Sequence, residues 1–242
     1  GAALNDPYSD RPDWKGLLLQ DSLEFIQRLK LCEELGLQAA THCIGDRAMD
    51  LALSSYGAVL GGTNDRRWRI EHAQVLGSRN LEAMRAFTVL PSVQPTHATS
   101  DMYWAGERLG RNRVRRAYAY RDLLEVNGVV ALGTDFPVEG IDPRATFYAA
   151  TARMDAEGYP AGGFQPEQGL TALQALKGMT LWAAIANFQE GQLGSIEVGK
   201  AADFTLVDRD LLEVSLEQGR DCLVLGTMIA GEWVYRESKE LR

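Results

Sequence analysis

Three residues that can bind a metal ion or carry a proton each end a short apolar run. They are His42, His72 and Asp135, and each run has the composition of a β-strand. Two neutral imidazoles and a carboxylate suit zinc or another borderline divalent ion. In a barrel of alternating strands and helices, catalytic side chains project from the C-terminal ends of the strands. The pattern therefore predicts a metal site at that edge of a parallel sheet.

Each of these residues also has a purely structural interpretation. A single strand histidine is more often a hydrogen-bonded core residue, and Asp135 precedes Phe136-Pro137, where a carboxylate can cap a turn. Two histidines at matching strand ends favour metal ligation over two unrelated core residues.

Three more residues follow strand-like segments and are candidates for contact with a substrate. Gln94 and His97 come after the third segment, where a histidine can polarise a substrate carbonyl or be a loop residue without a role. Arg47 follows Gly45-Asp46 at the start of a predicted helix, where a salt bridge is the alternative to a substrate contact.

Strand-like and helix-like segments alternate over the first 190 residues. Strands are expected near 37–42, 68–72, 88–93 and 129–135. Helices are expected at 21–35, 46–60, 78–87, 112–126, 142–155 and 171–187, with a long loop over 95–111. The alternation predicts an α/β fold with parallel strands and right-handed crossovers. The remaining part is β-rich, with strands expected at 202–207, 224–229 and 232–235.

Five ordered motifs resemble those of the amidohydrolase superfamily, in the branch called amidohydrolase family 3. They are His-x-Ile-Gly-Asp-Arg-Ala (42–48), Arg-Ile-Glu-His-Ala-Gln (69–74), Ser-Val-Gln-Pro-Thr-His (92–97), Gly-Thr-Asp-Phe-Pro-Val (133–138) and the tail 194–204. Each motif is weak alone, but their order is specific. The resemblance runs from residue 1 to about Tyr235.

This resemblance implies a metal-dependent hydrolase that cleaves a carbon–nitrogen bond, other than a peptide bond, in a small molecule. The cofactor would be a divalent metal, zinc foremost, with one or two ions in the complete enzyme. His42 and His72 would be the ligands from the fifth and sixth barrel strands, and Asp135 would touch the metal and act as the base. The expected substrate contacts are His97, Gln94 and Arg47.

Two features of the family are missing from this chain. The family has a His-x-His pair on its first barrel strand and a carbamylated lysine on its fourth. This chain has three histidines, none in such a pair, and none of its five lysines ends a strand before His42. Residues 1–190 are therefore expected to form the C-terminal half of a (β/α)8 TIM-type barrel. Residues 191–242 are expected to form the C-terminal part of a small, composite β-sandwich domain.

The incomplete barrel has two interpretations. In the first, the chain is a fragment that is inactive alone and needs the missing N-terminal half, or a partner chain that supplies it. In the second, it is a non-catalytic half-barrel, either a decayed gene product or a subunit that needs a partner chain to supply the N-terminal half. Either would leave unpaired sheet edges, which favour self-association into a homo-oligomer.

Composition restricts which binding partners and which cellular compartment are expected. A net charge of −8 and a pI near 5.0 argue against nucleic acid or an anionic membrane as a partner. The apolar runs fall short of the about 20 residues that span a bilayer. Three irregularly spaced cysteines predict a reducing cytoplasm, although a signal peptide upstream would lie outside this sequence. Cys43 is expected to point away from His42 as a buried apolar residue.

Overall fold

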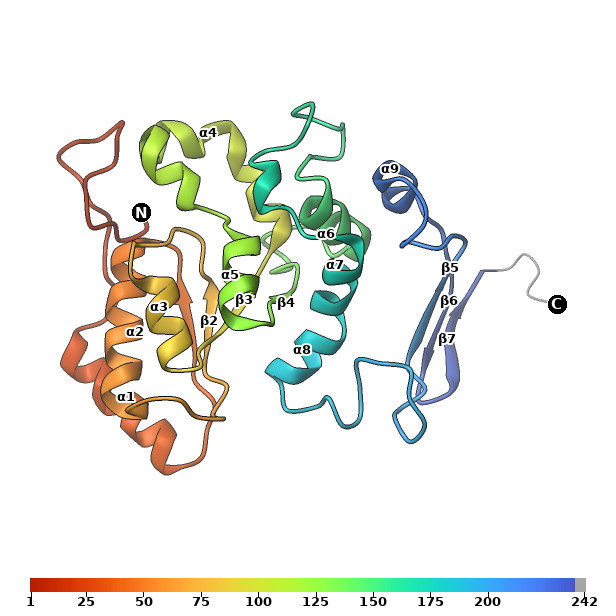
Figure 1. Ribbon diagram of the computed structural model, residues 1–242, viewed down its shortest axis with the longest axis horizontal. Coiled ribbons are helices and arrows are strands. Elements are labelled where there is room, and N and C mark those ends of the chain that lie inside the picture. Colours follow the sequence, from red (N-terminus) through yellow and green to blue (C-terminus); the bar gives the residue numbers. More distant parts are fainter. Residues whose placement is uncertain (238–242) are drawn as a thin grey trace.

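The centre of the protein is a four-stranded parallel β-sheet, seen in a computed structural model that describes residues 1–237 (Figure 1). Its strands are β1 (Ala40–Cys43), β2 (Arg69–His72), β3 (Leu90–Val93) and β4 (Ala131–Leu132). They lie in the order β1-β2-β3-β4, so each crossover leads to the neighbouring strand. The strands overlap the four predicted runs, and the α/β class with a parallel sheet agrees with the prediction.

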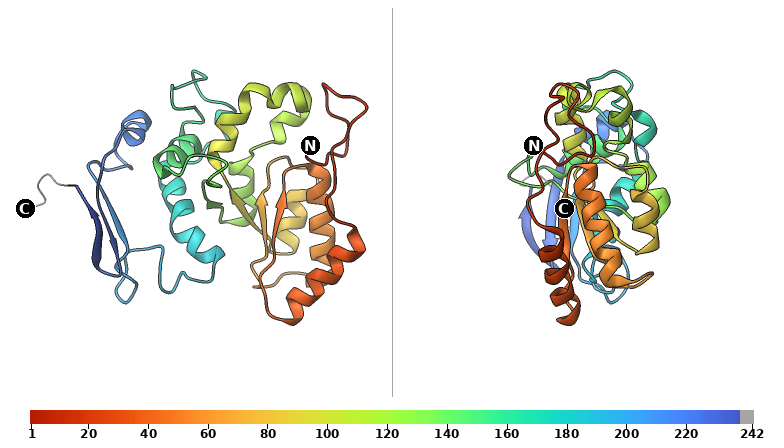
Figure 2. Two further views of the ribbon diagram at one scale, coloured as in Figure 1. Left: turned by 180° about the vertical axis from the view of Figure 1, so that it is seen from behind. Right: turned by 90° about the vertical axis from the view of Figure 1, so that its left-hand side faces the viewer.

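Helices form the crossovers between these strands. The helices before β3 are α1 (Ser22–Glu34), α2 (Asp46–Leu60) and α3 (Asn80–Ala86). Between β3 and β4 lie α4 (Pro95–Arg113), the short 3-10 helix η1 (Val114–Arg116) and α5 (Tyr120–Asn127). Right-handed crossovers between successive neighbours place their helices on one face of the sheet. Figure 1 shows α2, α3 and α5 in front of the strands, and the reverse view in Figure 2 shows the strands in front.

Two predicted segments are wrong. The expected loop over 95–111 is helix α4, which has Pro95 in its first turn, where proline is tolerated. Its buried positions include Ala98 and Ala105, and small alanines give little periodic signal. The expected helix 112–126 begins later, at Tyr120, because Ala117 is extended and Tyr118 has a positive φ of 55°.

The predicted helix 171–187 is broken in the structure. It consists of α7 (Ala172–Met179) and α8 (Leu181–Ala186), with Thr180 in a non-helical conformation between them. The Thr180 hydroxyl donates to the Leu176 carbonyl over 2.6 Å. Such a bond to the preceding turn competes with the helical ladder and bends a helix.

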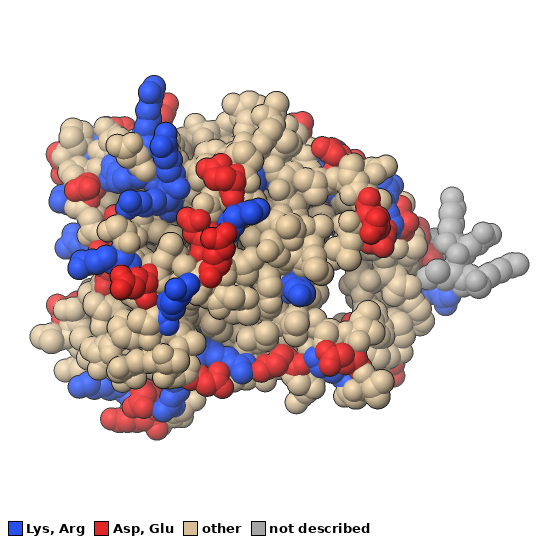
Figure 3. All heavy atoms as spheres, in the orientation of Figure 1, with Lys and Arg blue, Asp and Glu red and all other residues tan. Residues whose placement is uncertain are grey.

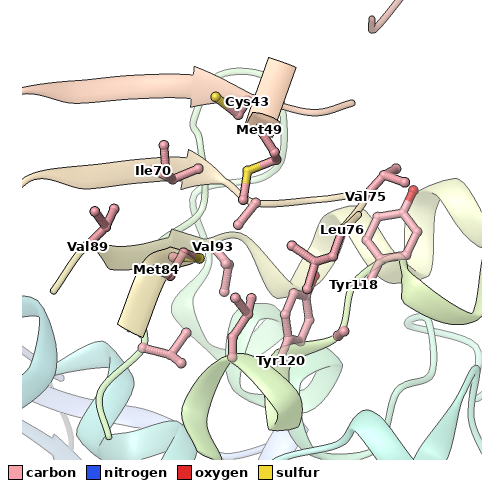
Figure 4. Close-up of a cluster of buried hydrophobic side chains, with 14 of the residues drawn as sticks. Cys43, Met49, Ile70, Val75, Leu76, Met84, Val89, Val93, Tyr118 and Tyr120 are labelled. Atoms are coloured by element: carbon pink, nitrogen blue, oxygen red, sulfur yellow. The ribbon is translucent and has the colours of Figure 1, made fainter. Parts of the chain in front are cut away.

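The main core lies between the sheet and its helices (Figure 4). Ile70 and Val93 are fully buried on β2 and β3, and Met49 of α2 and Met84 of α3 pack towards them. Trp68 is also fully buried, just before β2. Burying these side chains stabilises the sheet by roughly 1.5–3 kcal/mol each. The packed core therefore holds in place the strand ends that carry the candidate site residues.

The rest of the chain leads to a second, smaller sheet. After β4 come α6 (Pro143–Thr151) and the 3-10 helix η2 (Pro166–Gln168). The antiparallel sheet contains β5 (Phe204–Val207), β6 (Val224–Ile229) and β7 (Glu232–Arg236), with α9 (Leu216–Arg220) between β5 and β6. These strands agree with the predicted ones. Of the predicted unit 191–242, residues 238–242 lie outside the described part.

Basic side chains gather over α4 and the N-terminal segment on the face shown in Figure 3, with acidic side chains between them. Arg108 pairs with Asp10, and Arg113 donates to the carbonyls of Asp6 and Pro7. These arginines therefore fasten the N-terminal segment to α4. Among residues 1–237, no helix combines the length and the apolarity that crossing a membrane requires.

Candidate metal centre

The two strand-end histidines lie beside each other because β1 and β2 are parallel neighbours. Cys43 is the register partner of His72, one residue beyond His42. The His42 and His72 rings meet edge to face, with centroids 4.4 Å apart. Cys43 is 1% exposed and points to the opposite side of β1, and burial raises its thiol pKa to about 12. The prediction that Cys43 is a buried apolar residue is confirmed.

His72, His97 and Asp135 form one compact group. Each offers a ligand atom, and these atoms lie within 4.8 Å of one another. His97 Nε2 lies 3.7 Å from Asp135 Oδ2, and the rings of His97 and His72 stack with centroids 5.6 Å apart. This grouping depends on α4, which begins directly after β3 and places His97 in its first turn.

His42 falls outside that group, although its ring touches His72. Arg47 lies in the first turn of α2 with an exposed side chain, and its backbone amide donates to the Ala3 carbonyl. Among the described residues, its guanidinium takes part in none of the observed hydrogen bonds or ion pairs. The geometry thus gathers His72, His97 and Asp135 most tightly and leaves Arg47 apart.

Gln94 is bonded to His72. Its Oε1 lies 2.8 Å from His72 Nδ1, and both side chains are buried. An amide oxygen can only accept, so Nδ1 carries the proton and Nε2 keeps its lone pair. A hydrogen bond of this kind commonly fixes the tautomer of a metal-binding histidine.

A second layer of buried residues lies behind Gln94. The Tyr120 hydroxyl donates to the Gln94 backbone carbonyl over 3.1 Å. The guanidinium of Arg153, which is 0% exposed, lies over the Tyr120 ring, 4.8 Å from its centroid. Sequence analysis missed both residues, because neither belongs to a recognisable motif or precedes a polar strand end.

A further buried network lies next to the group. Tyr118 donates its hydroxyl proton to Asp101 Oδ2 over 2.8 Å, and Gln74 donates to the same oxygen over 2.9 Å. Burial raises the pKa of Asp101. Figure 4 shows Tyr118 and Tyr120 close together beyond the end of β3. The sequence signal that could have identified Asp101 was its spacing from His97, because residues four apart lie on one face of a helix.

The backbone is strained at His72, which ends β2, and at Asp135, which lies in the loop after β4. His72 has a φ of 72°, the following Ala73 has a φ of 43°, and Asp135 has a φ of 59°. Residues with side chains adopt these values at a cost of about 1–3 kcal/mol, and such strain collects at functional sites.

The electrostatic environment keeps the two strand-end histidines neutral. Burial lowers the pKa of His72, against the opposing effects of the Gln94 hydrogen bond and Asp135. Partial desolvation lowers the pKa of His42, and the nearby His72 lowers it further by a smaller amount. Neutral imidazoles are the form that binds a metal.

Comparison with known proteins places these features in a family. A profile of the Amidohydrolase family matches residues 1–235. The Arabidopsis thaliana protein LONG AFTER FAR-RED 3 is 32% identical over 237 residues, which cover 97% of this chain and 40% of that protein. The N-substituted formamide deformylase of Arthrobacter pascens is 28% identical over 210 residues, 85% of this chain and 38% of that enzyme.

A solved structure has a similar fold. An uncharacterized metal-dependent hydrolase from Pyrococcus horikoshii OT3 superposes with a TM-score of 0.79 and 34% sequence identity, over 89% of this chain and 43% of that one. The present chain therefore spans less than half the length of each of these three proteins.

Proposed function

Because this chain belongs to the amidohydrolase family, we propose that the whole protein is a metal-dependent hydrolase of carbon–nitrogen bonds in small molecules. The observation that carries the proposal is the convergence of His72, His97 and Asp135 at the C-terminal edge of the sheet. Two relatives support it by name, one as a metal-dependent hydrolase and one as a deformylase of N-substituted formamides. Substrates of that class, in which hydrolysis breaks a carbon–nitrogen bond, are the first to test.

We propose that His42, His72 and Asp135 take part in holding a divalent metal, with zinc the preferred ion for this donor set. When bound, the metal would act as a Lewis acid and make water a stronger nucleophile near neutral pH. Asp135 would accept the proton and return it to the leaving nitrogen. Its side chain is 36% exposed, so a substrate can reach it.

The substrate contacts predicted from the sequence remain His97, Gln94 and Arg47. Gln94 is already bonded to His72, so its contribution is to orient that ring. Arg47 is exposed and free to meet an anionic part of a substrate. The three cysteines are unpaired, which fits the predicted cytoplasmic location.

We further propose that residues 1–190 are half of a closed (β/α)8 barrel and that the small sheet is part of a composite β-sandwich. The strand order supports the first point, because a barrel places successive strands side by side and leaves β1 and β4 at the two open edges of this half. The partner would be the polypeptide that supplies the other half. If no such polypeptide restores activity, the non-catalytic half-barrel is the better interpretation.

The test is hydrolysis by the chain combined with the polypeptide that completes its barrel. N-substituted formamides and other small amides are assayed with added zinc, and Asp135→Asn is compared with the unaltered protein. A positioned acid–base group contributes about 10²–10⁴-fold, so kcat should fall by that order while the melting temperature changes little. Retention of most activity by Asp135→Asn would exclude its role as the base.

A further inference from the structure

We propose that a polar pocket between α2, the β2–α3 loop and the N-terminal segment binds a small, neutral α-amino acid as its zwitterion. The pocket has a volume of about 400 Å³, within the range of about 300–1,000 Å³ that is usual for small-molecule sites. Among the described residues that line it, none belongs to the candidate metal centre. The pocket is therefore a second site, and its occupancy does not depend on the proposed hydrolysis.

Two carboxylates without a cation partner line one part of the pocket. Asp46 and Asp50 lie one turn apart on α2, and both are half-buried. Asn5 links them, because its backbone amide donates to Asp46 Oδ1 over 2.9 Å and its side-chain amide donates to Asp50 Oδ2 over 2.8 Å. Asn80 donates to Asp50 Oδ1 over 2.7 Å. These amides hold the carboxylates in place but leave their charges unneutralised, and within residues 1–237 neither carboxylate forms an ion pair.

Two guanidinium groups without an anion partner line another part. Arg79 lies in the β2–α3 loop and Arg116 in η1, and both residues are exposed. The Leu76 amide donates to the Arg116 carbonyl over 3.0 Å, which ties the loop to η1. In the described part of the chain, no hydrogen bond or ion pair engages either guanidinium. Arg113, the third arginine of the lining, differs because its guanidinium donates to carbonyls of the N-terminal segment.

Opposite charges thus share one pocket without pairing, since no arginine nitrogen of the lining lies within 4.0 Å of an aspartate oxygen there. The lining holds three arginines and three aspartates, so its net charge favours neither a simple anion nor a simple cation. A ligand that carries both signs can satisfy both sets of groups. An amino acid has a carboxylate, which a guanidinium binds through two parallel hydrogen bonds, and an ammonium group, which donates to carboxylates.

The pocket also has an apolar part, which restricts the side chain of the ligand. Val75 and Leu76 contribute to the lining and are each 4% exposed. A short apolar side chain can contact this surface. A third charge on the ligand would repel one of the two sets of charged groups, so a neutral amino acid such as valine fits the pocket better than lysine or glutamate.

The experiment is equilibrium dialysis of the full chain against radiolabelled L-valine, with a chelator present so that no metal ion can bind the amino acid. We expect one valine per chain, with a Kd of about 1 mM or lower. Unlabelled N-acetyl-L-valine lacks the ammonium charge, and L-valinamide lacks the carboxylate. Each should compete at least about 10-fold more weakly than valine, because each loses hydrogen bonds between charged groups.

Three variants remove one charge each from the lining. Arg79→Gln, Arg116→Gln and Asp46→Asn should each weaken valine binding by about 10-fold. The new amide oxygen in Asp46→Asn can still accept from Asn5, so the fold is retained. Arg115→Gln is the matched control, because Arg115 is the exposed neighbour of Arg116 but does not line the pocket; it should bind valine like the unaltered chain.

Three results would overturn the proposal. The first is that valine fails to bind, which would mean that the four charged side chains satisfy one another in solution. The second is that N-acetylvaline or valinamide competes as well as valine, which would identify a site for a simple anion or a simple cation. The third is that the Arg79→Gln and Arg116→Gln variants, folded by their melting curves, bind valine within about threefold of Arg115→Gln.

Discussion

Replacing Tyr120 by phenylalanine tests whether the buried groups behind Gln94 support the metal centre. Tyr120 is 1% exposed, and its hydroxyl donates to the Gln94 backbone carbonyl over 3.1 Å. Burial raises the pKa of Tyr120, so the hydroxyl remains a donor at neutral pH. Tyr120→Phe removes the hydrogen bond to Gln94 and keeps the ring that lies under the Arg153 guanidinium.

The expected loss of stability follows from the partner that the carbonyl retains. The Gln94 carbonyl also accepts from the backbone amide of His97 over 3.1 Å, so it is not left without a donor. The free energy of unfolding should therefore fall by about 1 kcal/mol, near the net contribution of one hydrogen bond. Zinc affinity should fall as well, but by less than the about 10–100-fold expected for a group bonded directly to a ligand.

Tyr56→Phe is the matched control. Tyr56 is 0% exposed, and its hydroxyl donates to the Arg69 carbonyl over 2.9 Å and lies 2.6 Å from the Thr41 hydroxyl. Deleting this hydroxyl affects two groups, so the free energy of unfolding should fall by about 2 kcal/mol. Zinc affinity should stay unchanged, because the Tyr56 hydroxyl bonds neither Gln94 nor any residue proposed to hold the metal.

Urea unfolding, followed by tryptophan fluorescence, measures the first quantity, and chelator competition measures the second. The reasoning predicts a crossed result: Tyr56→Phe is less stable than Tyr120→Phe, yet only Tyr120→Phe binds zinc more weakly. Equal zinc affinities for the two variants, or a larger loss of stability in Tyr120→Phe, would refute it.

Two further predictions concern pH and association. Burial raises the pKa of Asp101, so its folded carboxyl is protonated at pH values where the unfolded one, with a pKa of about 3.9, is already ionised. The folded state therefore loses stability as the pH rises through that window. The Asp101→Asn variant still accepts hydrogen bonds from Tyr118 and Gln74, so its melting temperature should be higher than that of the unaltered chain at pH 7 and similar to it near pH 4. A lower melting temperature of the variant at pH 7 would contradict this prediction. The open edges of β1 and β4 should make the isolated chain self-associate, as measured by size-exclusion chromatography with light scattering. A stable monomer with a sharp, cooperative melt would count against the half-barrel.

The sequence determined the elements and the family. Strands and helices followed from local patterns of apolar residues, and the apolar runs that end at His42, His72 and Asp135 predicted a metal site at one edge of the sheet. These signals are local, because each depends on the residues of a single strand or turn. Helix α4 escaped prediction for the same reason, since its buried alanines carry too weak a local pattern.

Only the tertiary structure decided which side chains meet. His97 lies beside His72 because helix α4 starts directly after β3. His97 and Asp135 lie 3.7 Å apart, although the whole crossover from β3 to β4 separates them in the sequence. The bond from Gln94 to His72 and the support from Tyr120 likewise join residues on different elements. Periodicity along one strand cannot specify distances between strands and helices. Those distances are set by how the core packs, and they determine which three residues lie close enough to share one ion.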